Sequence, residues 1–235
     1  MTTPLVDLMV PAYNRWAFTE TCLTNLDVVT DWSLVREFVV YDSGSSDLTG
    51  QKLDPLAKSL GRNPTVVHMP PTSVTDVLVK HVMGTSSQFI AKLDNDTIVP
   101  PGWLPAMLDV LHRHPEVDLL GIEAHYPVAP APPNGYGYKV APFIGGIGVF
   151  RRTAFEGPMP KGRDIYFGFT EWQDKTPGLV KGWINPALAV CLLDRLPFEP
   201  WASLSMDYVR KGWQRPWPKY DPSQKILWSW KWRTS

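Results

Sequence analysis

Two aspartates, Asp94 and Asp96, are the residues whose types and spacing point most directly to chemistry. They follow an apolar segment, residues 88–93, which is typical of a buried strand. Side chains two residues apart in an extended chain share a face, so both carboxylates can bind one hard cation such as Mg²⁺ or Mn²⁺. Water and substrate phosphate oxygens would fill the remaining coordination positions. The alternative is that Asp96 or Thr97 only caps a turn before the next helix.

Polar side chains also follow two other predicted strands. Residues 11–15 come after an apolar segment at 5–10, and residues 42–45 come after a β-rich segment at 35–41. In an open parallel sheet, ligands bind outside the carboxyl ends of the strands. We therefore expect the three polar segments at one edge of a sheet, with carboxylates in two of them.

The elements that must position these residues alternate between strand and helix over residues 1–125. Hydrophobic periodicity and turn residues predict strands at 5–10, 35–41, 65–68, 88–93 and 117–124, and helices at 16–29, 48–60, 74–83 and 103–114. Such alternation calls for a mostly parallel sheet covered by helices on both faces. Beyond it we expect a surface loop at 126–138, an apolar segment at 143–150, a helix from Thr170 and a strand at 186–193.

Composition excludes several classes of protein. Apolar residues make up 44% and charged residues 20% of the 235 residues, as in a globular chain. Lys and Arg number 23, as do Asp and Glu, so nucleic acid is not an expected partner. The two cysteines, Cys22 and Cys191, cannot form a disulfide framework. Without a signal-peptide pattern or an uncharged run long enough to span a bilayer, a cytoplasmic location is expected.

An ordered set of motifs gives the sequence a family resemblance. The motifs are VPAYNR, VVYDSGSSD, FIAKLDNDTIVPPGWL, FIGGIGVFRRTAF, FTEWQD and GWINPALAV. Over about residues 4–196 they resemble the family-2 glycosyltransferases of the GT-A fold. The resemblance implies an α/β fold of the GT-A, Rossmann-like class, in which helices flank a mostly parallel central sheet.

The resemblance also implies how a nucleoside-diphosphate sugar donor is bound. The nucleobase would lie against the loop after the first strand and the acid ending the second, namely Pro11, Ala12, Tyr13 and Asp42, with Asn14 and Arg15 close enough to assist. The D-x-D group, Asp94, Asn95 and Asp96, would bind the ribose and, through Mn²⁺ or Mg²⁺, the diphosphate. Lys92 is either a phosphate contact or a solvated lysine. Gly145 and Gly146 would belong to the acceptor side.

The catalytic base is expected on the helix from Thr170. Glu171 lies eleven residues before Gly182, which matches the family's usual gap between the base and the glycine before the next strand. Asp174, one helical turn further on, is the alternative base. Glu171 is also a residue that a helix N-terminus favours without any catalytic role. Trp172 either stacks on a sugar or packs in the core.

The chain departs from the family pattern at three places. The family often has a second acid where this chain has Ser43, and often an Asp where Trp172 follows Glu171. Many members have a His before Leu-Asp where this chain reads Cys-Leu-Leu-Asp at 191–194. The third metal ligand is therefore either Asp194 or absent, and a surface ion pair is the alternative role of that carboxylate.

The residues from 205 to the end differ from the rest, with seven Lys or Arg, two Asp and five Trp. We expect a catalytic domain at 1–204, with a nucleotide-sugar half at 1–125 and an acceptor-side half at 126–204. The tail at 205–235 would pack on the domain or on a second subunit as a homo-oligomer contact. Peripheral membrane contact and a nucleic-acid surface are the alternatives.

The expected activity is metal-dependent, inverting transfer of one sugar from a nucleoside-diphosphate sugar, with a UDP-sugar favoured, to a hydroxyl on a glycan, protein or lipid. Inversion is implied by the resemblance, because a single in-line displacement needs one base. One alternative is a GT-A domain that binds sugar nucleotide or glycan without turnover. The other is a D-x-D-x-T phosphatase with Asp94 as nucleophile, a motif that such enzymes place on their first strand.

Overall fold

The computed structural model describes residues 5–122, 135–162, 168–186, 188 and 191–192. The described residues belong to one compact unit, Met1–Leu193. The predicted tail at 205–235 and Asp194 lie outside the described residues, so the role of the tail and the division at residue 204 stay predictions.

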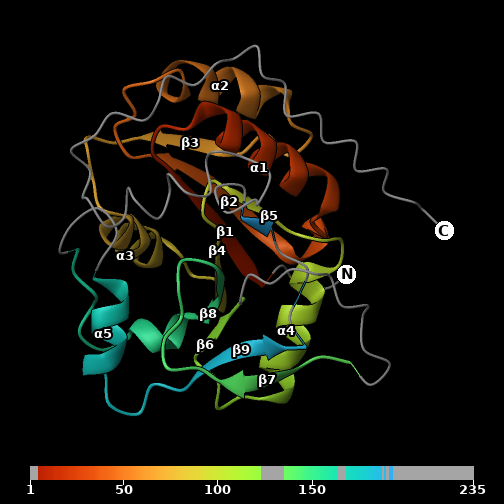
Figure 1. The fold of residues 1–235 in the computed structure, drawn as a ribbon, viewed down its shortest axis with the longest axis vertical. Coiled ribbons are helices and arrows are strands. Elements are labelled where there is room, and N and C mark those ends of the chain that lie inside the picture. The colour runs from red at the N-terminus through yellow and green to blue at the C-terminus, as the bar shows by residue number, and fades with distance from the viewer. Residues whose placement is uncertain (1–4, 123–134, 163–167, 187, 189–190, 193–235) are drawn as a thin grey trace. The chain divides into compact units, whose positions relative to one another are not determined.

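An eight-stranded sheet forms the centre of this unit (Figure 1), in the order β3-β2-β1-β4-β8-β6-β9-β7. The strands are β1 (Val6–Ala12), β2 (Val35–Asp42), β3 (Thr65–His68), β4 (Phe89–Lys92), β6 (Leu119–Gly121), β7 (Gly137–Val140), β8 (Gly148–Arg151) and β9 (Lys181–Asn185). Strands β1 to β4 pair in parallel, whereas β8 is antiparallel to β4 and β6, and β7 is antiparallel to β9. The predicted mostly parallel sheet is confirmed.

Helices cover both faces of the sheet. Helices α1 (Trp16–Val29), α2 (Thr49–Ser59) and α4 (Trp103–Arg113) bury their apolar side chains in one core cluster. Helices α3 (Val74–Gly84) and α5 (Phe169–Lys175) contribute to the other. Strand β1 divides its side chains between the two, since Leu8 and Val10 enter the first cluster and Met9 the second. Figure 1 shows α1 and α2 side by side, apart from α3 and α5.

The first half follows the predicted elements closely, with one instructive difference at Pro11. Helix α1 has the predicted bounds, but β1 continues through Pro11 to Ala12 instead of ending at Val10. The Met9 carbonyl accepts a hydrogen bond from the Leu93 amide, on the side of β4. Pro11 faces the same side two residues later, where β4 has ended at Lys92. Its missing N–H therefore breaks no ladder hydrogen bond.

The second half differs more from the predicted elements. Strand β7 begins inside the predicted loop at 126–138, and only residues from Gly148 of the apolar segment at 143–150 form a strand. The strand predicted at 186–193 is confirmed only at its end: β9 ends at Asn185, and among the described residues of that range only Cys191–Leu192 form a strand, β10. Proline at 186 cannot donate to a ladder, which ends β9 there. Strand β10 pairs with β5 (Thr97–Ile98), a short strand absent from the predictions.

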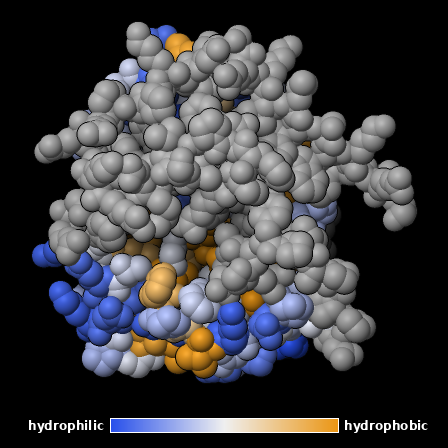
Figure 2. Space-filling view, viewed as in Figure 1, coloured by the Kyte–Doolittle hydropathy of each residue, from blue (hydrophilic) through white to orange (hydrophobic). Residues whose placement is uncertain are grey.

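Two 3₁₀ turns, η1 (Trp32–Leu34) and η2 (Arg152–Phe155), complete the described elements. Within the described part of the chain, none of the helices combines the length and apolar character needed to cross a membrane. Figure 2 shows hydrophobic side chains among hydrophilic ones over the region of β7, β9 and α5. In that region Val140 and Phe143 are 79% and 48% exposed.

Candidate functional site

Hydrogen bonds of Asn14 connect the loops that follow β1 and β2. Its backbone N–H donates to Ser45 Oγ at 2.8 Å. Its side-chain oxygen accepts from the backbone N–H groups of Ser46 and Asp47, at 2.8 and 3.2 Å. The Asn95 amide donates to the Asn14 carbonyl oxygen at 3.3 Å, which brings in the loop after β4. The three polar segments predicted to share one sheet edge therefore lie together.

Asn14 and Arg15 adopt a backbone conformation that is unusual for residues with side chains. Their φ values are 55° and 64°, both in the left-handed region, directly before α1. Such conformations cost free energy and persist where surrounding contacts enforce them, often at functional sites. Here the contacts of Asn14 enforce the turn, and the turn directs Arg15 toward the loop after β4.

Arg15 forms an ion pair with Asp96, the second aspartate of the D-x-D group. Arg15 Nη1 lies 2.9 Å from Asp96 Oδ2, and the side chains are 16% and 10% exposed. A partly buried, charge-assisted hydrogen bond of this kind is stronger than a surface ion pair. The arrangement fixes Asp96 against the loop that is predicted to bind the nucleobase.

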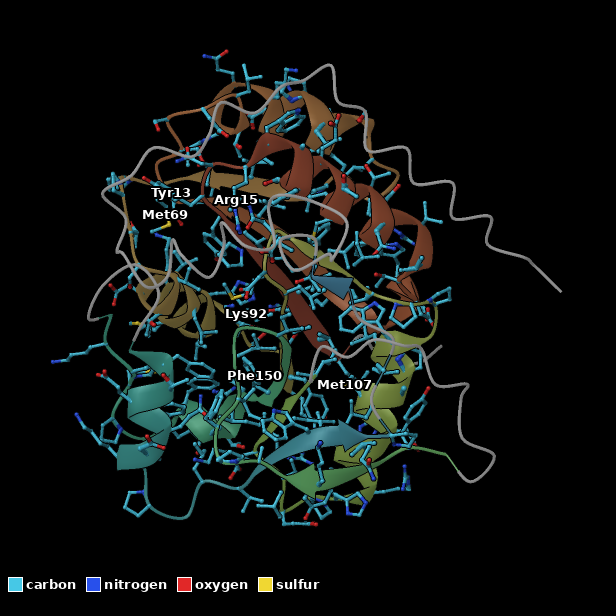
Figure 3. The ribbon with its side chains drawn as sticks, in the orientation of Figure 1. Tyr13, Arg15, Met69, Lys92, Met107 and Phe150 are labelled. Atoms are coloured by element: carbon cyan, nitrogen blue, oxygen red, sulfur yellow. The ribbon has the colours of Figure 1, made fainter. Side chains whose placement is uncertain are left out.

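Lys92 forms the corresponding contact with Asp94. Lys92 Nζ donates to Asp94 Oδ1 at 2.5 Å and to the Gly146 carbonyl oxygen at 2.6 Å. The Lys92 side chain is 2% exposed and that of Asp94 39% exposed. Figure 3 shows Lys92 on β4 and Arg15 on the loop after β1, which are neighbouring strands of the sheet. Lys92 is thus a buried cation whose ammonium joins Asp94 to the loop that contains Gly146.

Gly146 lies directly against the Asp94 carboxylate. A Cβ atom added at Gly146 would collide with both carboxylate oxygens, whereas one added at Gly145 would meet nothing within 4 Å. The absence of a side chain at Gly146 is therefore what leaves room for the Asp94 carboxylate. The two predicted acceptor-side glycines differ in this respect, and only Gly146 contacts the D-x-D group.

Side chains of α1 support the loop of Asp94, Asn95 and Asp96 from the core side. The Asn95 amide donates to Thr19 Oγ1 at 2.8 Å. Cys22 Sγ lies 3.6 Å from the Asp94 carbonyl oxygen, and burial raises the pKa of the Cys22 thiol, so it stays protonated. Thr19 and Cys22 therefore hold this loop in place from the core, through the Asn95 amide and the Asp94 backbone.

Asp42, the acid that ends β2, is held by two donors. Asp42 Oδ1 accepts from the Ser45 backbone N–H at 2.9 Å, and Asp42 Oδ2 lies 2.9 Å from His68 Nδ1. The side chain of Asp42 is 6% exposed. His68 ends β3 and is the register partner of Asp42. His68 is absent from the predicted site residues, although its position at the end of a parallel strand beside β2 is a signal that the sequence offers.

The other residues predicted to contact the nucleobase lie at the end of β1 and directly after it. Pro11 and Ala12 are buried at the end of β1, and the Ala12 carbonyl accepts from the Ser43 N–H at 2.8 Å. Tyr13 follows as a half-buried residue, and Figure 3 shows it on the same loop as Arg15. The hydrogen bond between Ala12 and Ser43 therefore joins the ends of β1 and β2.

Helix α5 carries the two candidates for the base. Glu171 lies in its first turn, and Asp174 is 70% exposed, with Oδ1 3.7 Å from Lys181 Nζ. The buried amide of Gln173 pairs with Ile144, accepting from its N–H at 2.7 Å and donating to its carbonyl at 2.9 Å. Because Ile144 is two residues before Gly146, this pair links α5 to the loop beside Asp94.

Trp172 packs in the core. It is 7% exposed, its ring stacks on Phe155 with centroids 5.1 Å apart, and its Nε1 donates to the Pro158 carbonyl at 2.6 Å. Of the two predicted roles, packing in the core agrees with these contacts, and Trp172 is not among the proposed sugar-binding residues.

The residues present fit a hard divalent cation only in part. Across residues 5–122 and the later described segments, no group of three His, Cys, Asp or Glu side chains is placed to hold a metal ion. Asp94 and Asp96 supply carboxylate oxygens, the ligands that Mg²⁺ and Mn²⁺ prefer, and the Asp94 side chain is 39% exposed. A cation bound here would complete its coordination shell with oxygens of the substrate and water.

The fold is shared with solved structures of low sequence identity. The mannosyltransferase PcManGT of Pyrobaculum calidifontis, solved with GDP-Man and Mn²⁺, has a TM-score of 0.57 and 18% identity over 78% of this chain and 57% of its own. TarS 1-349 of S. aureus, solved with UDP-GlcNAc, has a TM-score of 0.57 and 15% identity over 79% and 57%. A mycobacterial protein has a TM-score of 0.56 and 18% identity over 77% and 65%. The chain thus spans less than two thirds of the length of these structures.

The sequence comparisons identify the family. No curated protein matched the chain by sequence. The family described as "Glycosyl transferase family 2" matches residues 7–156, which is more than half of the chain and includes the three loops described above. The chain belongs to glycosyl transferase family 2.

Proposed function

We propose that this chain transfers one sugar from a nucleoside-diphosphate sugar to a hydroxyl acceptor, with inversion and with the help of a divalent cation. The observation that carries the proposal is the joining of three loops at one sheet edge. Asn14, Asn95 and the Arg15–Asp96 pair hold these loops together, and the loops bear Asp42, Asp94 and Asp96. Membership of the glycosyl transferase family supports the reaction class.

In this proposal the nucleobase lies against residues 11–13 and donates an N–H to Asp42. Each carboxylate oxygen has two lone pairs, so Asp42 can accept from the base in addition to Ser45 and His68. The solved structures of similar fold contain GDP-Man in one case and UDP-GlcNAc in another. We favour a UDP-sugar, and a comparison of the two bases is part of the test.

The charges around the D-x-D group support dependence on a divalent cation. Two cations, Arg15 and Lys92, are paired with two anions, Asp94 and Asp96. A donor diphosphate adds two negative charges to this balanced group, and an uncompensated charge in a partly buried site is costly. Asp94 and Asp96 would hold Mn²⁺ or Mg²⁺, which when bound supplies Lewis-acid stabilisation of the departing diphosphate.

Glu171 is our candidate for the base. Its carboxylate would take the proton of the acceptor hydroxyl as that oxygen attacks the anomeric carbon, while the bond to the diphosphate breaks. Gln173, on the same helix, connects α5 to the Gly146 loop and would keep Glu171 in register with the donor. The acceptor is a hydroxyl on a glycan, a protein or a lipid.

Hydrolysis of the donor tests this function without knowledge of the acceptor. We expect the protein to cleave a UDP- or GDP-sugar slowly in Mn²⁺, and not in EDTA. A domain that only binds sugar nucleotide would show a Mn²⁺-dependent rise in unfolding temperature with no cleavage. A phosphatase would instead cleave simple phosphomonoesters. If the protein neither binds nor cleaves any nucleoside-diphosphate sugar, that result would contradict the proposal.

A further inference from the structure

His68 occupies a position between two carboxylates. Its Nδ1 lies 2.9 Å from Asp42 Oδ2, and its Nε2 lies 2.9 Å from Asp54 Oδ2. Asp42 ends β2 beside it, and Asp54 comes from α2. These are the titratable groups that face the ring from the two elements packed against it. The His68 side chain is 44% exposed, so it exchanges protons with solvent, whereas Asp42 is 6% exposed.

The geometry determines the protonation state of the ring. A carboxylate accepts hydrogen bonds, so each ring nitrogen must carry a hydrogen to bind its aspartate. A neutral imidazole has one N–H and can serve one carboxylate only. The arrangement therefore requires an imidazolium. In agreement, the hydrogen bonds to Asp42 and Asp54 raise the pKa of His68 above its ordinary value.

We propose that His68, as an imidazolium between Asp42 and Asp54, is a positioning residue that fixes the Asp42 carboxylate for the donor's nucleobase and makes donor binding depend on pH. This inference rests on the proposed function, because it assumes that Asp42 accepts a hydrogen bond from the base. Ser45 binds one oxygen of Asp42 and His68 binds the other. These two contacts fix the orientation of the carboxylate, and with it the directions of the lone pairs that remain for the base.

Loss of the proton has a defined consequence. The neutral ring keeps one N–H, and when that hydrogen resides on Nε2, the lone pair of Nδ1 faces Asp42 Oδ2 and repels it. Asp42 then loses one of its two fixed partners and is free to rotate away from the orientation that suits the base. Donor affinity should therefore be highest at low pH and fall as the pH rises through the pKa of His68, above about 6.5.

Titration of the full chain with a UDP- or GDP-sugar in Mn²⁺ between pH 5.5 and 8.5 tests this. A sugar nucleotide is suitable because its diphosphate lacks the terminal phosphate group that titrates in this range. We expect the dissociation constant of the wild type to rise roughly three- to tenfold over the range, as a charge-assisted hydrogen bond is lost. His68→Gln replaces the ring by an uncharged amide donor that does not titrate, and should bind with the weaker affinity at every pH.

Two control variants separate this role of His68 from a general effect of pH on donor binding. Asp54→Asn removes the second carboxylate and should keep the affinity at pH 5.5 while moving the transition to lower pH. His112→Gln changes an exposed histidine on α4 and should leave the wild-type curve unchanged. A flat wild-type curve, or a His68→Gln curve that follows the wild type, would overturn the inference while leaving the proposed function intact. A wild type that binds no donor at any pH would overturn both.

Discussion

The Lys92 ammonium lies 2.5 Å from Asp94 Oδ1 and 2.6 Å from the Gly146 carbonyl oxygen, in a side chain that is 2% exposed. One buried cation therefore holds the first aspartate of the D-x-D group and the loop that belongs to the predicted acceptor side. The two parts of the proposed site meet at this contact.

Replacement of Lys92 by Met should destabilise the fold. Met fills a similar volume but leaves Asp94 without its cation, and loss of one partner of a buried pair is costly; since Asp94 is partly exposed, we expect about 1–3 kcal/mol. Urea unfolding measures this. The double variant Lys92→Met with Asp94→Asn should recover part of the loss, because it removes the unpaired charge. A loss in the double variant equal to the sum of the losses in Lys92→Met and Asp94→Asn alone would show that the pair contributes nothing.

A methyl group at Gly146 should impair donor binding, because its Cβ would displace the Asp94 carboxylate. We expect Gly146→Ala to weaken Mn²⁺-dependent binding of the sugar nucleotide by about tenfold or more, which corresponds to about 1.4 kcal/mol. Gly145→Ala is the matched control, since its Cβ meets nothing within 4 Å, and should bind like the wild type. Similar affinities for the two variants would refute the role given to Gly146.

The assignment of the base is tested by two substitutions on one helix. Glu171→Gln should leave donor binding intact and lower the rate of transfer, or of donor hydrolysis, about 10²- to 10⁴-fold, since removal of a general base has effects of this size. Asp174→Asn should retain activity, because Asp174 is 70% exposed beside Lys181. Full activity in Glu171→Gln together with loss in Asp174→Asn would transfer the role to Asp174.

Much of the first half could be predicted from the sequence because its signals are local. The apolar spacing that buries Leu23 and Leu26 defines α1, and the placement of polar residues at strand ends follows from parallel pairing. Strand β7 could not be predicted, since Gly137 and Tyr138 lie in a Pro- and Gly-rich segment and become a strand only by pairing with β9. The extension of β1 through Pro11 likewise depends on where β4 ends.

The residues of the candidate site could likewise be predicted from the sequence only in part. The D-x-D group and Asp42 are visible in the sequence because acidic residues follow apolar strands. Partners of two of these acids come from distant positions: Arg15 reaches Asp96 across 81 residues, and His68 reaches Asp42 across 26. Pairwise contacts of this kind are set by sheet order, which strand patterns alone do not specify. Trp172 illustrates the converse, because its type fits a sugar platform while its packing against Phe155 places it in the core.

The most direct test of the central claim is the rise in unfolding temperature on addition of UDP- and GDP-sugars, in Mn²⁺ and in EDTA. We compare the wild type, Asp96→Asn, and Asp109→Asn as a control on an exposed aspartate of α4. A donor at one hundred times its dissociation constant should stabilise the wild type and the control by about 2.7 kcal/mol in Mn²⁺. Asp96→Asn should show no such gain, and neither should any protein in EDTA. An equal gain in EDTA, or in Asp96→Asn, would contradict the account.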